Sequence, residues 1–327
     1  MTGRTRISFL NLCGSGLSLL ERLSLEEALL RHDSLQRSWA IVGYHDPIRG
    51  TPSRIRPVIE SSLEFSDRRH YPGCAIVLGL GGKPDQLVNL PKAKEDNVMM
   101  IKRFSGGGTV VVDQDSLLTT FIGRNKHFPD LKPFPRDIMD WSLQFFNPAF
   151  DSMNKLVYSK DSSGGRRNTL AMQGNSCGLN DIKSNTTNVE FKRIPKFFLR
   201  ENDYVLGSKK MGGNAQSIVK GGFLHHTSFL WDYVDDHMEY LTLPSKRPKY
   251  RGNRSHNDFL VKLSSYYEGL NKKVFFDQLK EATLNSLEIE EVQLEDALYV
   301  VEDKFGSLQQ WFEGECRTRI IDYEQIQ

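Results

Sequence analysis

The 327-residue sequence predicts one compact domain that combines β-strands with helices. Short apolar runs of strand length surround two glycine-rich phrases in the middle of the chain. Apolar side chains recur at helical spacing near both ends. With 39% hydrophobic and 26% charged residues, the chain can bury a sizeable core, and no apolar run is long enough to span a bilayer. We therefore expect a soluble intracellular protein.

The first third of the chain predicts a strand, a helix and a loop. Residues 7–12 have the pattern of an opening strand, and residues 19–32 carry leucines at helical spacing. Glu26 and Glu27 on this helix are expected to form a solvated face. Residues 49–71, rich in Pro, Ser and Arg, predict a long exposed loop. Further strand-like segments follow at residues 97–101, 110–112 and 117–122.

The middle of the chain predicts a helix followed by a second loop. Residues 137–147 are amphipathic, because Ile138, Trp141 and Phe145 share one face. Residues 160–191 show neither helical nor strand periodicity, so we expect a loop, either a plain surface insertion or a lid over a site. Residues 197–199 and 204–206 resume the sheet.

After residue 257 the periodicity is again helical. One stripe contains Phe259, Leu260, Leu263, Tyr266 and Tyr267, and a second contains Phe276, Leu279, Leu284 and Leu287. A third mixed run covers residues 292–312.

The first glycine-rich phrase contains Gly106, Gly107 and Gly108 between strand-like segments. Glycine tolerates positive φ and lets a ligand approach the backbone, so such a turn can present successive amides to an anion. Arg103 adds a planar charge beside it. A β-bulge or a tight hairpin is the structural alternative.

The second phrase, residues 201–216, has matching chemistry. Its pattern predicts a hairpin that turns at Gly207 and Ser208 and delivers one lysine beside exposed backbone. Asp203 is near enough in sequence to pair with that lysine across the hairpin. A solvated turn would also suit these residues.

Three ordered motifs, residues 103–110, 202–215 and 224–230, resemble those of the lipoate protein ligase family, whose broader relatives are octanoyltransferases and biotin protein ligases. Residues 25–30 and 75–79 add support, and the resemblance covers most of residues 7–270. It implies an α+β fold with a mixed, largely antiparallel sheet backed by helices.

The resemblance also implies the site. The family's arginine-glycine loop matches Arg103, Gly106, Gly107 and Gly108, and the family's catalytic lysine matches Lys210 rather than Lys209, because Lys210 holds the fixed spacing to Gly213. The remaining acyl- and nucleotide-binding positions implied by the family are Asn202, Asp203, Gly213, Asn214, Ala215 and His226. Asp203 is also the first candidate ligand for Mg²⁺.

The implied activity is attachment of lipoate, via lipoyl adenylate, to a lysine of a lipoyl carrier domain. The implied cofactors are ATP, Mg²⁺ and lipoate, and the implied partners are lipoyl domains of 2-oxoacid dehydrogenase complexes and the glycine cleavage H protein. An anion must meet an α-phosphate in a dry pocket, so we expect Lys210 to act as an electrostatic clamp and not as a nucleophile. Cys13, Cys74, Cys177 and Cys316 fall outside the motifs, which argues against a covalent cysteine route, with Cys177 the least secure exclusion.

Two segments depart from the family pattern. Residues 112–116 read Val-Asp-Gln-Asp-Ser where the family has a histidine and then Asp-x-Gly-Asn, and Thr227-Ser228 replaces Gly-Thr. We expect residues 1–327 to form a single catalytic domain with residues 254–327 as its C-terminal helical layer, and no separate accessory domain. Three hypotheses follow: a ligase, an octanoyl or lipoyl acyltransferase of the same fold, or a non-catalytic protein that binds lipoyl domains or lipoate.

Net charge and cysteine usage limit the classes of partner and the cellular compartment that we expect. The net charge of +2 suggests no nucleic-acid partner, and residues 166–167 and 246–251 are expected to be solvated basic loops. Four cysteines without CxxC spacing indicate a reducing compartment. The basic start leads directly into the opening strand, so we expect no cleavable presequence and a cytoplasmic or mitochondrial protein.

Overall fold

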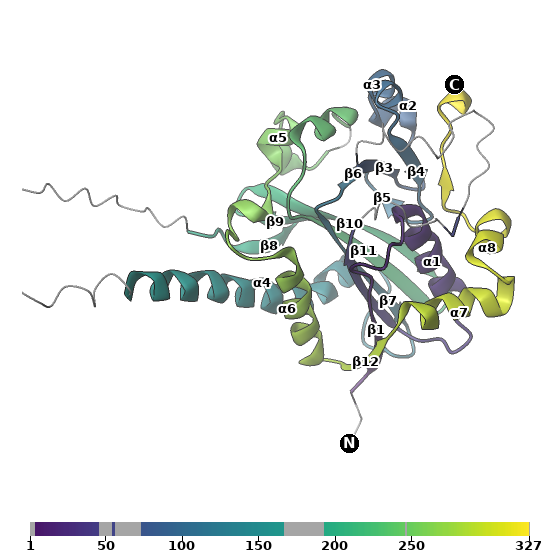
Figure 1. Ribbon diagram of the computed structural model, residues 1–327, viewed down its shortest axis with the longest axis horizontal. Coiled ribbons are helices and arrows are strands. Elements are labelled where there is room, and N and C mark those ends of the chain that lie inside the picture. Colours follow the sequence, from purple (N-terminus) through teal and green to yellow (C-terminus); the bar gives the residue numbers. More distant parts are fainter. Residues whose placement is uncertain (1–3, 46–53, 56–72, 167–192, 246, 327) are drawn as a thin grey trace, which may run out of the picture.

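The computed structural model describes residues 4–45, 54–55, 73–166, 193–245 and 247–326 (Figure 1). Most of the exposed loop expected at residues 49–71 therefore lies outside the described residues, as do residues 167–191 of the second expected loop. No helix among the described residues is long and apolar enough to cross a membrane.

Nine of the described strands form the larger sheet, at the centre of the molecule (Figure 1). Its first three strands pair in parallel and the others antiparallel, so the sheet is mixed and largely antiparallel, which confirms the predicted fold class. In spatial order the strands are β12 (Glu288–Val292), β1 (Arg6–Asn11), β2 (Trp39–Tyr44), β7 (Ser116–Arg124), β11 (Gly222–Leu230), β10 (Lys209–Val219), β9 (Asp203–Leu206) and β8 (Phe197–Arg200), with β5 (Gly106–Gly107) also paired to β10.

A second sheet carries the approach to the glycine loop. Its spatial order is β13 (Arg319–Ile320), β4 (Met99–Lys102), β3 (Cys74–Leu78) and β6 (Val110–Asp113). Strands β3 and β4 are parallel, and β4 ends one residue before Arg103. The sheet thus points the predicted glycine loop toward β10.

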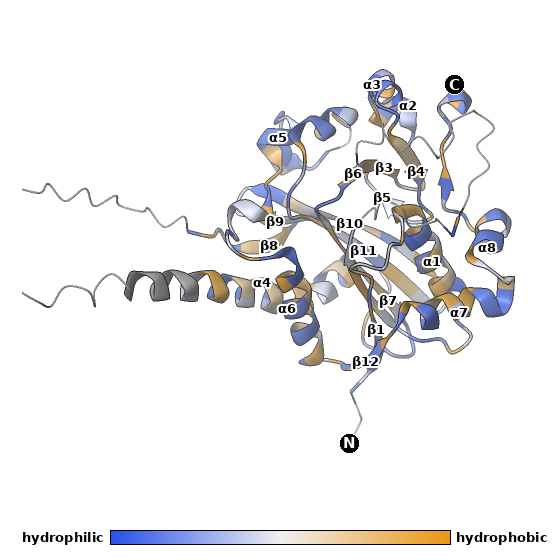
Figure 2. Cartoon of the chain, viewed as in Figure 1, coloured by the Kyte–Doolittle hydropathy of each residue, from blue (hydrophilic) through white to orange (hydrophobic). Residues whose placement is uncertain are grey.

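Helices cover both faces of the larger sheet because its strands alternate. Phe9 and Ala40 belong to the core under α4 (Pro135–Arg166) and α6 (Lys272–Leu284), whereas Leu10 and Ile41 belong to the core under α1 (Leu19–His32), α7 (Leu294–Phe305) and α8 (Leu308–Gly314). Figure 2 shows hydrophobic colour on the strands and hydrophilic colour on the outer turns of the helices. The helices α2 (Pro84–Leu87), α3 (Leu90–Glu95) and α5 (His256–Phe259) are short.

Helix α1 has the predicted bounds, and its start is fixed by a capping box. Ser18 accepts a hydrogen bond from the backbone of Glu21, whose side chain in turn accepts from the backbone of Ser18. The expectation that Glu26 and Glu27 face solvent is wrong, because both side chains are buried. Their burial requires partners, which lie in the site described below.

Two further expectations about helices need correction. Helix α4 continues to Arg166, so residues 160–166 are helical and not part of a loop. The stripe from Phe259 to Tyr267 is not one helix: α5 ends at Phe259, and a single 3-10 turn follows at Leu263–Ser265. These apolar residues are buried all the same, since Leu263 and Tyr267 join the core beside α6.

Residues 254–327 supply strands as well as the expected helices. Strand β12 extends the larger sheet beside β1, and β13 extends the second sheet beside β4. Two 3-10 turns, Asp235–Tyr240 and Lys249–Arg251, connect the end of β11 to α5, and a last one lies at Tyr323–Gln325.

Candidate functional site

The first two glycines of the triplet form a short strand rather than an open turn. Gly107 pairs with Ala215 of β10, and Gly106 pairs with Gln216. Gly107 has φ of +123°, in the region that favours glycine. The loop is therefore attached to the second strand of the lysine hairpin, more than one hundred residues later in the chain.

Arg103 holds this loop from inside. Its side chain is buried, and Nη1 donates to the carbonyl of Val77 at 3.3 Å while Nη2 donates to Gly108 at 2.7 Å. Burial lowers the pKa of Arg103 to about 10, so the guanidinium is still a cation at neutral pH. No carboxylate pairs with it among the described residues, and its Nε–H has no partner there. The positive charge is thus available to an anion placed on the loop.

Gly79 makes this arrangement possible, and sequence analysis did not single it out as a site residue. A Cβ at Gly79 would lie 2.2 Å from the carbonyl oxygen of Gly107 and 3.3 Å from Nη2 of Arg103. Only glycine lets the end of β3 approach the loop so closely. A glycine directly after a buried strand was the available signal.

Lys210 lies on the predicted hairpin, which turns at Gly207 and Ser208 between β9 and β10. Its Nζ is 2.7 Å from Oδ1 of Asp203, and about a quarter of the side chain is exposed. The same Nζ is 3.3 Å from the point where a Cβ of Gly213 would stand. The missing side chain of Gly213 therefore leaves room for the ammonium over β10.

The geometry brings Arg103 and Lys210 to neighbouring positions of β10. Nη2 of Arg103 lies 2.8 Å from where a Cβ of Gly107 would be, and Gly107 pairs with Ala215. Lys210 reaches Gly213, two residues earlier, and a two-residue step along a strand is about 6.7 Å. Two positive charges from distant parts of the chain thus meet at one stretch of strand.

Asn214 and Asn202 tie the hairpin to the same stretch. Nδ2 of Asn214 donates to the backbone carbonyl of Asn202 at 2.7 Å. Both oxygens of the neighbouring Asp203 are occupied, because Tyr250 donates its hydroxyl to Oδ2 at 2.8 Å while Lys210 holds Oδ1. Burial, together with the Asp203 carboxylate, raises the pKa of Tyr250. Tyr250 comes from the turn after β11 and was not foreseen from the sequence.

Asp203, the first candidate ligand for Mg²⁺, is engaged by protein groups in this structure. Both oxygens of Asp203 accept protein hydrogen bonds, so a Mg²⁺ ion would have to share these oxygens with Lys210 and Tyr250 or take the place of Lys210. In the part of the chain that the structure describes, no group of three His, Cys, Asp or Glu side chains could hold a metal. Metal binding by Asp203 stays a prediction.

His226 contacts the glycine loop through Ser105. Its Nε2 is 2.7 Å from Oε2 of Glu26, and its Nδ1 is 3.3 Å from the hydroxyl of Ser105, two residues after Arg103. Arg22 and Thr120 also donate to Glu26, at 2.9 and 2.8 Å. Burial by itself would raise the pKa of Glu26, but Arg22 and His226 hold it below its ordinary value. Glu26 is thus a buried carboxylate that fixes His226 and, through it, the loop.

Glu27, the neighbouring glutamate, fastens the C-terminal segment to α1. It accepts from the backbone amides of Arg317 and Thr318 at 3.1 and 3.0 Å and pairs with Arg31 at 3.0 Å. A pattern of helical spacing could not reveal either role, because all partners except Arg31 are far away in sequence.

The described cysteines do not support a covalent route. Cys13, Cys74 and Cys316 are free thiols, and burial raises the pKa of Cys74 and of Cys316 to about 12. Such thiols remain protonated at neutral pH and are poor nucleophiles. Cys177 lies outside the described residues.

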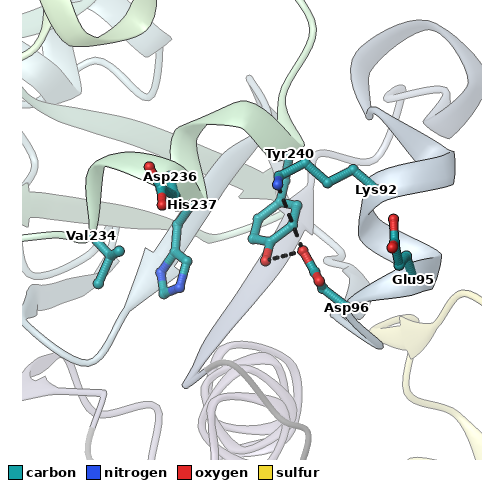
Figure 3. Close-up of a pocket in the computed structure, with 7 residues that line it drawn as sticks. All are labelled: Lys92, Glu95, Asp96, Val234, Asp236, His237 and Tyr240. Carbon is teal, nitrogen blue, oxygen red and sulfur yellow. Dashed lines mark hydrogen bonds and ion pairs between the residues drawn. The ribbon is translucent and has the colours of Figure 1, made fainter.

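Residues 112–116, which depart from the family pattern, contact the lining of a cavity that lies away from the predicted site residues. Asp113 accepts from Nδ1 of His237 at 2.8 Å and from the backbone amide of Val234 at 2.9 Å. His237 lines a cavity of about 350 Å³ between α3 and the first 3-10 turn, shown in Figure 3. There the Tyr240 hydroxyl donates to Asp96 at 2.9 Å. None of the predicted site residues lines this cavity.

Comparison with protein families and known proteins gives matches to lipoate protein ligases. A family model described as the lipoyl protein ligase A/B catalytic domain matches residues 70–288. A Plasmodium falciparum protein named inactive lipoate–protein ligase 2 is 31% identical over 280 residues, 81% of this chain and 66% of the relative. Lipoate-protein ligase A of Blochmanniella floridana is 24% identical over 211 residues, 64% of this chain and 50% of the relative. The match thus spans about two thirds and one half of the length of these relatives.

Solved structures share the fold at low sequence identity. The crystal structure of P. falciparum LipL1 in complex with lipoate has a TM-score of 0.56 and 16% identity, and covers 94% of this chain and 71% of that one. Lipoate-protein ligase A bound with ATP has a TM-score of 0.53 and 16% identity, over 92% and 95% of the two chains. Since the family model covers residues 70–288, this chain belongs to the lipoyl protein ligase A/B catalytic domain family.

Proposed function

We propose that this protein is a lipoate protein ligase-like enzyme that holds lipoyl adenylate over β5 and β10 and passes the lipoyl group to a lysine of a lipoyl carrier domain. The observation that carries the proposal is the convergence of the Arg103 guanidinium and the Lys210 ammonium on neighbouring positions of β10. An acyl adenylate carries its negative charge at the phosphate beside the acyl carbonyl, where two such cations are most useful.

To stabilise the acyl phosphate, Lys210 must exchange Asp203 for the phosphate as its ion-pair partner. In the structure its charge is satisfied by Asp203, so binding of the acyl phosphate must compete for the ammonium. Asp203 can tolerate the loss because the Tyr250 hydroxyl remains on its other oxygen. The flexible lysine stem permits the movement, while Arg103, buried and bonded to three carbonyls, stays in place.

The transfer step then needs mostly positioning. The carrier lysine, as a neutral amine, attacks the acyl carbonyl, the bond to the phosphate oxygen breaks, and AMP leaves with its charge stabilised by Arg103 and Lys210. The amine loses its proton to solvent or to a nearby base. The proposed carriers are lipoyl domains of 2-oxoacid dehydrogenase complexes and the glycine cleavage H protein. A T. acidophilum relative of the same fold was solved as a bipartite ligase with its E2 lipoyl domain, which supports this class of partner.

A second candidate function is transfer from an adenylate or an acyl carrier made elsewhere. One observation favours it over complete ATP-dependent ligation: the relative with 31% identity is named an inactive lipoate–protein ligase. Transfer alone would make this chain an acyltransferase. Binding without transfer would make it a lipoate- or lipoyl-domain-binding protein.

One set of incubations separates these functions. Purified protein is mixed with an apo lipoyl domain and either lipoate, ATP and Mg²⁺, or synthetic lipoyl adenylate, or octanoyl acyl carrier protein. Pyrophosphate release with a modified carrier in the first mixture supports the ligase. Modification only in the second or third mixture supports the transferase, and measurable binding without modification supports the binding protein.

Lys210→Ala tests the site, with Lys209→Ala as the matched control. Removing Lys210 should lower transfer from lipoyl adenylate at least about 100-fold, because one charge that stabilises the leaving group is lost. Lys209 is exposed at the hairpin turn, so its removal should leave the rate unchanged. Circular dichroism should show both variants folded. Equal rates in the two variants would exclude Lys210 from the site.

A further inference from the structure

A second cavity, of about 430 Å³, lies away from the candidate site. Its walls come from the C-terminal end of α1, the turn between β10 and β11, and residues 315–317. The residues that matter for its chemistry are Arg31, His32, Arg124, Lys220, Glu315 and Arg317. None of them belongs to the glycine loop or the lysine hairpin.

The cavity has an excess of positive charge. Four of its side chains are cationic, and Glu315 is its single carboxylate. Of the four, Arg31 is paired with the buried Glu27 at 3.0 Å. The side chains of Lys220 and Arg317 make no hydrogen bond or ion pair with any residue that the structure describes, so their charges are uncompensated.

Arg124 lines the cavity and is 4% exposed. Nη1 and Nη2 donate to the carbonyls of Leu30 and Leu29 at 2.7 and 2.8 Å, and Nε donates to that of Arg37 at 3.1 Å. A guanidinium has five N–H groups, so two remain after these bonds. Burial lowers the pKa of Arg124 and the nearby Asp33 carboxylate partly opposes this, but Asp33 is itself paired with Arg37 at 3.0 Å, and the hydrogen-bond partners of Arg124 are carbonyls. Two of these bonds also satisfy carbonyls in the last turn of α1, where the negative end of the helix dipole disfavours an anion.

Glu315 and His32 do not cancel this charge. Oε2 of Glu315 is 3.7 Å from Nε2 of His32, and Nζ of Lys304 is 2.7 Å from Nδ1 of the same ring. The single carboxylate of the cavity is therefore accompanied by a fifth cation at its edge. Burial and the neighbouring Lys304 lower the pKa of His32, so the ring is neutral at physiological pH.

We propose that this cavity is a binding site for a phosphate group, either inorganic phosphate or the phosphate of a small ester. Arg124 would supply a buried, fixed donor, and Lys220 and Arg317 would close over the anion from two exposed segments. The volume suits a small ligand. Arg31 connects the cavity to the candidate site, since its guanidinium lies 6.0 Å from the ring of Phe104, next to Arg103.

The test measures phosphate binding by the full chain and by the double variant Lys220→Gln/Arg317→Gln. Isothermal titration with inorganic phosphate, and separately with AMP, should show binding to the native protein that weakens about tenfold for each cation removed. Tighter binding of AMP than of phosphate that is lost in the double variant would assign the cavity to phosphate esters, and equal losses for the two ligands would assign it to the phosphate group alone; AMP binding that the double variant keeps belongs to the proposed active site. Both side chains are exposed and unbonded in the described part, so the double variant should keep its melting temperature.

Two controls keep this site distinct from the proposed active site. Lys132→Gln removes an exposed lysine elsewhere and should leave phosphate binding unchanged. Lys210→Ala should retain phosphate binding here even if it loses activity with lipoyl adenylate. Absence of binding at millimolar phosphate, or equal affinity in the native protein and the double variant, would overturn the proposal. Neither result would bear on the role of Lys210.

Discussion

Individual side chains in this protein owe their chemistry to burial. Arg103 and Lys210 meet at β10, but the arginine is buried among carbonyls and the lysine is a quarter exposed. The buried guanidinium keeps a fixed geometry, whereas the ammonium can exchange Asp203 for a ligand. A rigid and a movable cation together suit a site that must first admit and then release an anion.

His225 provides a measurable consequence of burial. Its Nε2 is 2.9 Å from the Tyr204 hydroxyl and its Nδ1 is 3.0 Å from Nε2 of Gln216, and burial lowers its pKa to about 3. The unfolded chain binds a proton near pH 6.5 and the folded chain does not. Stability from this group is therefore present above pH 6.5 and falls as the pH drops toward 3, by about 1.4 kcal/mol per pH unit.

Urea unfolding at pH 7 and pH 5 tests this expectation. The free energy of unfolding should fall by about 2 kcal/mol from His225 alone over that interval. The variant His225→Gln should show a correspondingly smaller fall, while His256, whose pKa burial lowers to about 4, contributes equally to both proteins. The same fall in both proteins would mean that His225 is protonated in the folded state.

At the scale of elements, the glycine loop depends on one close approach between backbones. The end of β3 at Gly79 lies against Gly107, and β5 in turn pairs with β10. The two sheets are thus joined at the loop that carries Arg103. A side chain at Gly79 would push the glycine loop away from the end of β3 and disturb its pairing with the lysine hairpin.

Gly79→Ala should therefore disrupt the loop, and Gly108→Ala is its matched control. The added methyl of Gly79→Ala would stand 2.2 Å from a carbonyl oxygen, so we expect a loss of about 2–4 kcal/mol in stability and loss of transfer activity. At Gly108 no atom lies within 4 Å of the added methyl and φ is not in the positive region. Thermal unfolding should show Gly108→Ala close to the native protein. Similar melting temperatures for the two variants would contradict this account of Gly79.

Sequence patterns predicted the elements whose determinants are local. The opening strand, helix α1 and the hairpin through Gly207 all follow from periodicity or turn residues within a few positions. The end of α4 was missed because Ser162 to Gly165 have low helix propensity, whereas an existing helix adds further residues at little cost.

The candidate site was predictable only where a motif carried it. The resemblance named Arg103 and Lys210, but Tyr250 on Asp203 and Glu26 on His226 join residues 47 and 200 positions apart. No periodicity reports such a pair. Glu26 was misread for that reason: its helical position alone gave no sign of the histidine beside it.

For the whole molecule, the main question is whether the C-terminal segment forms one domain with the rest of the chain. Residues 254–327 give β12 to the larger sheet and β13 to the second sheet, and α7 packs on α1. Trp311 is fully buried, and its Nε1–H donates to the carbonyl of Ser24 at 2.9 Å. These contacts support the proposal of a single domain, since separate units rarely share both sheets and a core.

Unfolding should accordingly be one cooperative transition. Tryptophan fluorescence and far-UV circular dichroism should give the same urea midpoint, because the four tryptophans include Trp311 in the C-terminal segment and Trp39 at the centre of the larger sheet. Trp311→Phe keeps an aromatic ring but removes the donor to Ser24, and should lower stability by about 1–3 kcal/mol without splitting the transition. Two separate midpoints, with the earlier one missing from the fluorescence of Trp311→Phe, would instead show that residues 254–327 unfold on their own. Hydrogen exchange at α1 would then distinguish the cases, since a departing C-terminal segment would uncover the helix that carries Glu26 and Glu27.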